Sequence, residues 1–186
     1  LDTDLRNIGT ITGNAETGAS AADNVAARLE AIRALPDAEE KPTIFLVDST
    51  SDTIFSSGSF GGPQGIFDAA GARNATEDVA DTWTSISWER LAAEDPDMIA
   101  FVDYGEQTVE DKIAALRAHP ASRDLKAVRE NRFVNLPYGM WVSSPLNIDA
   151  AETIRAVLEQ HGLVPETGLT PRLDVAELQL GGNDWL

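Results

Sequence analysis

The chain has 186 residues, the size of one ordinary domain, and 42% of them are hydrophobic, which excludes a disordered chain. Its net charge of −17 comes without a basic stripe that could follow a phosphate backbone, so nucleic acid is not an expected partner. The absence of cysteine excludes thiol nucleophiles, Cys-ligated zinc, iron–sulfur clusters and disulfides. No hydrophobic run approaches the roughly 20 residues that a membrane-spanning helix needs.

The amino-terminal part of the chain is predicted to be helical. It opens at Leu1 with neither an initiator Met nor a signal sequence, so we expect a processed chain or a piece of a longer one. Residues 4–8 are predicted to be the end of a helix that Gly9 closes. A second helix, at residues 16–35, has apolar positions at helical spacing and is stopped by Pro36. At 1.5 Å per residue it is on the order of 30 Å long, enough to cross a whole lobe.

Three short apolar runs predict strands that are buried on both faces of a parallel sheet. They lie at residues 43–47, 98–102 and 132–136, and a weaker strand is predicted near residues 84–86. Helical patterns separate the runs, at residues 64–70, 88–94, 109–117 and 121–128. This alternation predicts a three-layer α/β lobe with a mostly parallel sheet and right-handed crossovers.

The last predicted helix has Ser144 as its N-cap and Pro145 at its first position, and it ends at Gly162. Residues 163–186 show little periodicity, so we expect a tail that packs on the surface of the lobe.

Ligands of open parallel sheets bind beyond the carboxyl ends of the strands, which makes the loops there the candidate site. These loops cover residues 48–62, 103–107 and 138–144, where aromatic residues stand among Ser and Gly. Such loops suit a bulky, partly apolar ligand, although each aromatic ring could instead cap the core of the sheet. The candidate ligand-binding residues are Phe60, Tyr104, Tyr138 and Trp141.

Other site chemistries find little support. The Gly-rich residues 56–62 lack both the Lys-Ser/Thr ending of a P-loop and the spacing of a dinucleotide fingerprint. A nucleophilic hydrolase would need a histidine in a strand-end loop, but His119 and His161 fall at helix ends. The remaining enzyme alternative is a hydrolase that uses Asp48 and Asp103, which both follow strands, although such acids also cap loops. We therefore expect a protein without catalysis, bound metal or cofactor.

Five segments resemble, in chain order, the substrate-binding proteins of ABC importers for iron-siderophores, haem and cobalamin. The resemblance covers roughly residues 5–160, and the ordered set is more specific than any single motif. The segments are Ala70-Gly71-Ala72-Arg73-Asn74, Ser87-Trp88-Glu89-Arg90-Leu91, Asp95-Pro96-Asp97-Met98-Ile99, Leu125-Lys126-Ala127-Val128-Arg129-Glu130-Asn131-Arg132-Phe133 and Ser144-Pro145.

That family joins two α/β lobes by one long helix and holds its ligand in the cleft between them, with little hinge motion. The resemblance therefore implies that the chain lacks most of the amino-terminal lobe. It also implies an extracytoplasmic protein, periplasmic or a cell-surface lipoprotein, with an ABC permease as partner and the membrane reached only through that permease or a lipid anchor. The implied divisions are the end of the amino-terminal lobe at 1–13, the connecting helix at 14–36, the carboxy-terminal lobe at 37–162 and the tail at 163–186.

The resemblance also assigns a role to Glu89. Each lobe in the family presents a surface glutamate to permease arginines, and Glu89 stands at the position of the carboxy-lobe residue. The alternative is that Glu89, in the first turn of a helix capped by Ser87, only complements the helix dipole.

The charge of the strand-end loops bears on the ligand, which the family resemblance leaves open. The three loops contain no Lys or Arg, whereas acidic residues lie in or beside them. We therefore favour a neutral or cationic ligand, such as a ferric hydroxamate, over an anionic catecholate. Haem remains an alternative, with Tyr104 or Tyr138 on its iron. The acidic residues are Asp48, Asp52, Asp103 and Glu106.

Overall fold

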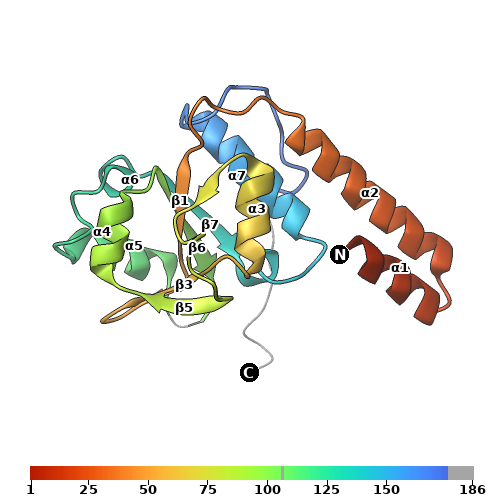
Figure 1. Ribbon diagram of the computed structural model, residues 1–186, viewed down its shortest axis with the longest axis horizontal. Coiled ribbons are helices and arrows are strands. Elements are labelled where there is room, and N and C mark those ends of the chain that lie inside the picture. Colours follow the sequence, from red (N-terminus) through yellow and green to blue (C-terminus); the bar gives the residue numbers. More distant parts are fainter. Residues whose placement is uncertain (106, 176–186) are drawn as a thin grey trace.

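A helical hairpin projects from an α/β lobe in the computed structural model, which describes residues 1–105 and 107–175 (Figure 1). The hairpin consists of α1 (Asp2–Ile11) and α2 (Ala15–Arg33). A Cβ on Gly9 would lie 2.8 Å from the Cα of Gly18, so the two backbones are in direct contact there. The prediction that Gly9 closes the first helix is wrong, because its missing side chain is needed for this contact. The left-handed turn falls later, at Gly13, with φ of 74°.

The lobe is built on a parallel sheet with the strand order β4-β1-β6-β7. Its strands are β1 (Thr43–Val47), β4 (Arg73–Asn74), β6 (Met98–Asp103) and β7 (Phe133–Pro137). All five residues of β1 are buried, as expected for a strand covered on both faces. The three apolar runs thus form the predicted parallel strands, and the predicted α/β class is confirmed.

A second sheet of three antiparallel strands, in the order β2-β3-β5, follows β1. It consists of β2 (Ser49–Thr50), β3 (Ile54–Ser57) and β5 (Trp83–Ile86). The weak strand predicted near residues 84–86 is therefore real, but it belongs to this small sheet. We did not predict β2 and β3, because the Ser- and Gly-rich residues 48–62 have the composition of a loop.

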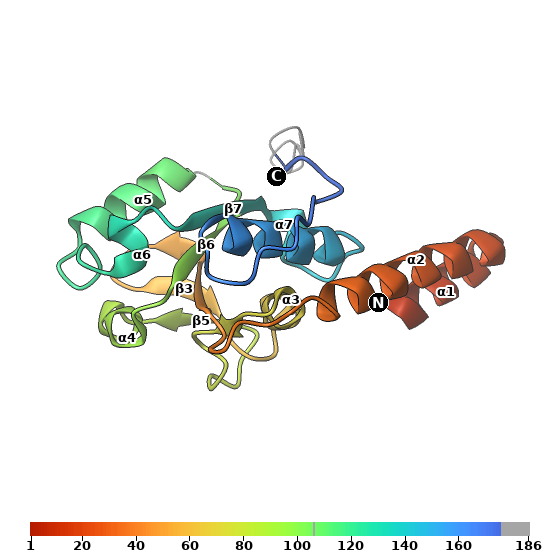
Figure 2. The same ribbon diagram turned by 90° about the horizontal axis from the view of Figure 1, so that it is seen from above.

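Helices cover both faces of the parallel sheet and make the three predicted layers (Figures 1 and 2). One layer contains α3 (Gly62–Ala70) and α7 (Asn147–Gln160). The other contains α4 (Trp88–Glu94), α5 (Val109–Ala118) and α6 (Lys126–Arg129). Successive residues of β1 point to opposite layers, so Ile44 packs in the first hydrophobic cluster and Phe45 in the second.

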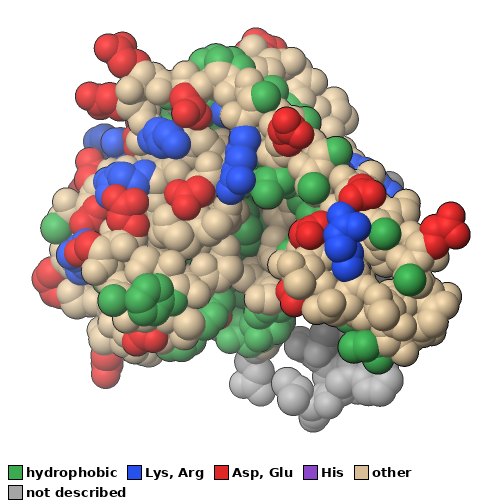
Figure 3. Space-filling model, turned by 45° about the vertical axis from the view of Figure 1, so that its right-hand side comes forward, with side chains coloured by type: hydrophobic (Ala, Val, Ile, Leu, Met, Phe, Trp, Pro, Cys, Tyr) green, Lys and Arg blue, Asp and Glu red, His purple; other side chains and the backbone are tan. Residues whose placement is uncertain are grey.

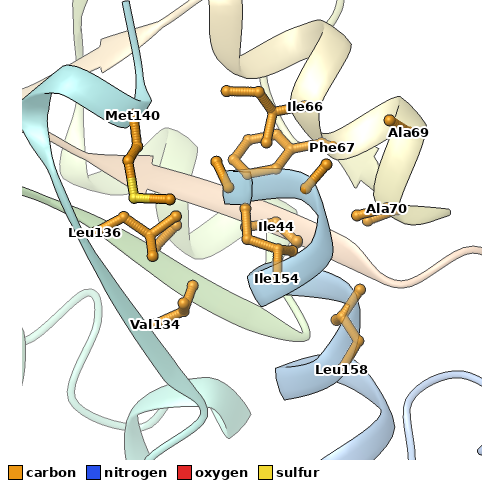
Figure 4. Close-up of a cluster of buried hydrophobic side chains, with 14 of the residues drawn as sticks. Ile44, Ile66, Phe67, Ala69, Ala70, Val134, Leu136, Met140, Ile154 and Leu158 are labelled. Atoms are coloured by element: carbon orange, nitrogen blue, oxygen red, sulfur yellow. The ribbon is translucent and has the colours of Figure 1, made fainter. Parts of the chain in front are cut away.

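The first hydrophobic cluster packs α3 and α7 together on one face of the parallel sheet, as Figure 4 shows. Phe67 of α3, Ile154 of α7 and Ile44 of β1 lie together in this cluster, and all three are completely buried. Val134 and Leu136 extend the cluster along β7. Since full burial of one such side chain is worth about 1.5 to 3 kcal/mol, this cluster holds the strand ends in fixed positions.

The start of α7 differs from the prediction, because the helix begins at Asn147 rather than after Ser144. The Ser144 hydroxyl donates to the carbonyl of Gly139 (2.7 Å) and accepts from the amide of Leu146 (3.2 Å). Ser144 therefore belongs to the turn before the helix. The Asn147 side chain donates to the carbonyls of Met140 and Val142, which ties this turn to the helix end.

Charged side chains hold the hairpin and the linker on α7. Arg28 of α2 donates to Asp149 (2.5 Å) and, through two nitrogens, to Glu152 (2.7 and 2.9 Å). The bonds to Glu152 raise the pKa of Arg28 further above its usual value. Arg155 pairs with Glu159 (3.1 Å) and donates to the carbonyl of Pro36 (2.8 Å) in the linker. These contacts fix the path of the chain from hairpin to lobe.

The chain after α7 returns along that helix. Val164 is buried, and the amides of Thr167 and Arg172 donate to Glu159 and Glu152. The remainder of the predicted tail, residues 176–186, lies outside the described residues. Among the helices of the described residues, none combines the length and the apolar character needed to cross a membrane.

Candidate functional site

Two of the predicted ligand-binding residues lie together at the carboxyl ends of neighbouring strands. Tyr104 follows β6 and Tyr138 follows β7, where Asp103 and Pro137 are paired in register. The centroids of the two tyrosine rings are 4.9 Å apart and the rings are tilted by 46°. Tyr104 is 41% exposed and Tyr138 is 45% exposed, so both rings are available to a ligand.

Phe60 reaches the surface from a loop that packs beside the Tyr138 loop. A Cβ on Gly62 would lie 2.6 Å from the carbonyl oxygen of Trp141, so the two loops touch through their backbones. The amide of Phe60 donates to the carbonyl of Asp81 (3.0 Å), which fixes the loop from the other side. Phe60 is 69% exposed, and its ring is free for contact with a ligand.

Trp141 lies in the core of the lobe, which was the alternative considered for each of the candidate aromatic rings. The side chain is completely buried, its ring edge meets Phe67 at 5.8 Å between centroids, and its Nε1 donates to the carbonyl of Leu136 (3.1 Å). The placement of this ring on the binding surface is therefore corrected. Trp141 holds the loop after β7 from below, and an apolar, hydrogen-bonded indole is well suited to that task.

Asp48, at the end of β1, holds the hydroxyl of Tyr104. The phenol donates to Asp48 Oδ1 over 3.1 Å, and Asp48 itself is only 3% exposed. Burial raises the pKa of Asp48. Burial and the adjacent Asp48 charge raise the pKa of Tyr104 to about 12. The hydrogen of the Tyr104 hydroxyl is thus held on the oxygen by its bond to Asp48.

Lys112 is a site residue that the sequence reading missed. It comes from α5, is 1% exposed, and donates from Nζ to the carbonyl of Val102 (2.6 Å). Its Nζ lies 6.0 Å from the centroid of the Tyr104 ring. Burial lowers the pKa of Lys112, while the charges of Asp48 and Asp103 oppose that shift. The three loops carry no cation of their own, yet a helix places one beneath them. One feature of the sequence could have indicated it. Lys112 precedes the apolar Leu116 by four residues, a spacing that puts both side chains on the same face of a helix.

The polar residues around the two tyrosines are mostly acceptors. Asp103 is exposed, and its Oδ2 accepts from Asn135 Nδ2 at 3.1 Å. The Oδ1 of Asn135 is buried and has no hydrogen-bond partner among the described residues. Gln107 pins the loop after β6 to β2, because its Oε1 accepts from the Thr50 amide (2.9 Å) and its Nε2 donates to the Thr50 hydroxyl (2.8 Å).

The acidic residues that the structure describes in these loops form no metal site. Asp52 is exposed, and Glu106 lies outside the described residues. Within residues 1–105 and 107–175, no three His, Asp or Glu side chains converge as metal ligands.

A large hollow of about 850 Å³ lies away from the strand ends, between the hairpin and the start of α7. Figure 3 shows a furrow between the hairpin on the right and the lobe on the left. Its charged lining includes Arg28 and Asp149, which are paired with each other. The furrow therefore marks where the hairpin leaves the lobe, and the aromatic loops form a separate, open surface.

Glu89 lies in the first turn of α4, on the surface. The hydroxyl of Ser87 caps this helix by accepting from the Arg90 amide (3.1 Å), as the sequence predicts. Trp88 points inward, is 5% exposed and donates to the carbonyl of Ser51 (3.1 Å). No salt bridge in the described part of the chain involves Glu89. Its position is compatible with both of its predicted roles.

The two strand-end carboxylates considered for a hydrolase have unlike surroundings. Asp48 is buried and bound by Tyr104, whereas Asp103 is exposed and bound by Asn135. Hydrolysis by a carboxyl pair needs both groups open to the scissile bond and to water. The arrangement is better suited to holding a ligand than to cleaving one.

The sequence of the chain matches a known protein family. The family model described as periplasmic binding protein matches residues 1–138, which is most of the chain. The chain belongs to the periplasmic binding protein family. Members of this family are binding proteins, which agrees with the expected lack of catalysis. A search of curated proteins gave no match.

Solved structures of periplasmic binding proteins share the fold. One from Veillonella parvula is 25% identical, with a TM-score of 0.73, over 87% of this chain and 56% of its own. An Fe3+-hydroxamate transport protein from Saccharomonospora viridis is 18% identical, with a TM-score of 0.73, over 85% of this chain and 55% of its own. A haem-binding protein from Pseudomonas aeruginosa is 22% identical, with a TM-score of 0.72, over 91% and 62%. The chain thus spans little more than half the length of these relatives.

Proposed function

We propose that this chain forms the connecting helix and carboxy-terminal lobe of the extracytoplasmic substrate-binding component of an ABC importer. In this proposal residues 1–13 end an amino-terminal lobe, residues 14–36 connect the lobes, and the strand-end loops form one wall of the cleft. The observation that carries the proposal is the pair of exposed rings of Tyr104 and Tyr138, 4.9 Å apart at the sheet edge where α/β proteins bind ligands.

The ligand we propose is an iron-siderophore or a similar bulky chelate, such as haem or cobalamin. Exposed aromatic rings on loops held by buried side chains suit a large and partly apolar molecule. Two structural relatives, one described as an Fe3+-hydroxamate transport protein and one as haem-binding, support this class of ligand. The predominance of acceptors around Tyr104 favours a neutral or cationic chelate over an anionic catecholate.

Ligand binding is tested by tryptophan quenching of the protein with its amino-terminal lobe, titrated with ferric hydroxamates, ferric catecholates, haem and cobalamin. We expect one chelate class to quench and saturate. Tyr104→Ala should then weaken binding about tenfold, since a well-buried aromatic contact is worth on the order of 1 to 3 kcal/mol. Arg123→Ala, an exposed change in the segment between α5 and α6, is the control and should bind normally. Saturation by none of the four ligands, or turnover of a hydrolase substrate, would contradict the proposal.

Glu89 is proposed to dock the protein on the permease rather than to bind the ligand. A carboxylate on an exposed helix face can meet an arginine across an interface, and like charges there cost several kcal/mol. Glu89→Arg should therefore reduce uptake in reconstituted vesicles strongly while leaving the dissociation constant of the ligand unchanged.

Glu110→Arg is the matched control for this docking test. Glu110 is also exposed and also lies in the first turn of a helix, α5, so reversing its charge disturbs the helix dipole in the same way. We expect uptake by this variant to stay near the wild-type rate. Equal uptake by both variants would leave Glu89 with the helix-dipole role alone.

The proposed location is extracytoplasmic, periplasmic or on the cell surface, with a lipid anchor as the link to the membrane. Protease added to intact cells or spheroplasts should then digest the protein, and metabolic labelling with a fatty acid should mark it. Protection in spheroplasts would contradict the location, and lack of label would contradict the anchor.

A further inference from the structure

The hydroxyl of Tyr104 has its hydrogen committed to the protein. It donates to Asp48 Oδ1, which is buried beneath the ring, so the phenol cannot donate to a ligand without breaking this bond. Its oxygen keeps a lone pair that can accept. Tyr104 therefore offers a ligand an acceptor and the exposed part of its aromatic ring.

The cation beneath the site is turned inward. Lys112 is 1% exposed and donates to the carbonyl of Val102, so its ammonium cannot reach an anionic ligand in this arrangement. It does lie close enough to Asp48 and Asp103 for their charges to act on its pKa. Lys112 thus offsets the buried charge of Asp48 and leaves the exposed charge of Asp103 as the one that faces outward.

The exposed groups at this end of the sheet consequently all favour a positively charged ligand group. Asp103 presents an exposed carboxylate directly before Tyr104, and Tyr104 and Tyr138 present exposed aromatic rings, whose faces carry a negative quadrupole. A carboxylate and aromatic faces together attract an ammonium group, by ion pairing and by the cation–π interaction. A propionate or catecholate oxygen would instead meet repulsion from Asp103.

We infer that Asp103, Tyr104 and Tyr138 form a subsite for a positively charged, N–H-bearing arm of the ligand, with Asp48 and Lys112 holding Tyr104 in position. This inference rests on the proposed function and narrows its ligand from a chelate of any charge to one with a cationic arm. In this subsite Asp103 pairs with the ammonium group, and the two rings cover the arm. Asp48 and Lys112 act as positioning residues, since both are buried.

The test compares two ligands that differ only in the arm. Ferrioxamine B is a ferric hydroxamate whose chain ends in an ammonium group, and its N-acetylated form keeps the same iron centre without that charge. Tryptophan quenching of the protein with its amino-terminal lobe gives both dissociation constants. We expect the wild type to bind the ammonium form about tenfold more tightly, the size expected of a partly shielded ion pair with a cation–π contact.

In Asp103→Asn the two dissociation constants should differ by no more than about twofold, mainly because the ammonium form binds more weakly. The change is isosteric and exposed, and a thermal melt checks that the variant folds. Glu110→Gln, the same loss of one charge outside the subsite, should keep the preference.

The outcomes separate this inference from the proposed function. Equal binding of the two chelates by the wild type, or a preference that survives Asp103→Asn, would overturn the subsite and leave the proposed function standing. The same holds if neither chelate binds but haem or cobalamin does. If no ferric chelate, haem or cobalamin binds at all, the proposed function itself has failed.

Discussion

Among the described residues, buried charges occur in two regions, along α7 and beneath the strand-end loops, and they are satisfied in different ways. On α7 every one of them has an opposite charge at hydrogen-bonding distance, as in Arg28 with Asp149 and Glu152 or Arg155 with Glu159. Beneath the loops, Asp48 accepts a hydrogen bond from a phenol and Lys112 donates one to a peptide carbonyl. The first set joins elements of the fold, and the second supports a surface.

The direction of the pKa shifts expresses the same difference. Burial would raise the pKa of Glu159, but bonds from Thr167 and Arg155 outweigh it and leave that pKa lowered. For Asp48 the effect of burial prevails over its hydrogen bonds and the charge of Lys112, and its pKa is raised. Ionised Glu159 therefore stabilises the fold, whereas ionised Asp48 destabilises it. Residues kept in spite of such a cost are candidates for a functional role.

The largest expected effect comes from breaking the α7 pairing at Arg28. Arg28→Met leaves Asp149 and Glu152 buried without their cation, and the loss of one partner of a buried pair costs about 3 to 5 kcal/mol. Urea unfolding of the chain, followed by circular dichroism, should show a midpoint shifted to lower urea by the corresponding amount.

The control removes all three charges together. Arg28→Met combined with Asp149→Asn and Glu152→Gln leaves no unpaired ion, so most of the lost stability should return. Equal stabilities of the single and the triple variant would contradict the view that ionic pairing holds the hairpin on α7.

A smaller effect should follow from separating the two strand-end loops at Gly62. A Cβ there would lie 2.6 Å from the carbonyl oxygen of Trp141, whereas a Cβ on Gly65, one turn further along α3, would meet nothing within 4 Å. Gly62→Ala should cost about 1 to 3 kcal/mol by forcing the backbones apart. Gly65→Ala should instead stabilise the helix by about 0.5 to 1 kcal/mol. Thermal melts of the two variants check the contrast, which fails if both shift in the same direction.

The smallest expected effect is the opposite response of two carboxyls to pH. The lowered pKa of Glu159 adds stability above the usual value of 4.5, and this stability is lost as the pH falls through the lowered pKa. The raised pKa of Asp48 removes stability as the pH rises from 3.8 through the raised pKa.

Glu159→Gln should cost about 1 kcal/mol at pH 7 and less in acid. Asp48→Asn should gain stability relative to wild type as the pH rises through that window. Unfolding curves between pH 3 and 7 measure both, and slopes of the same sign would contradict the assignment.

The parallel sheet and its three layers were predictable because the two central strands, β1 and β6, are short, continuous and apolar, which suits a strand covered on both faces. The small antiparallel sheet was not, since β2 and β3 consist largely of Ser and Thr among few apolar residues. The end of α1 was misplaced for a related reason. A glycine can serve either as a turn or as a contact between helices, and the sequence around Gly9 is compatible with both.

The site was predictable in its location and only partly in its members. Parallel topology places the loops after β6 and β7 side by side, so the proximity of Tyr104 and Tyr138 follows from strand order. The burial of Trp141 depends on the side on which the chain turns after β7, which periodicity does not encode. Lys112 was missed because it reaches the loops from α5 rather than from a strand end.

The contact between Gly9 and Gly18 also has a mechanical consequence. Where two helices touch backbone to backbone, no layer of flexible side chains separates them. We therefore expect α1 and α2 to move together as one rigid unit. This pair of helices is attached to the lobe by Arg28 and by apolar side chains such as Leu29 and Ile32, toward the opposite end of α2 from Gly18. A sideways load on α1 therefore acts with the leverage of most of the length of α2. Such a load acts on the ionic and the apolar contacts between α2 and the lobe, and the hairpin would rotate about them as one body.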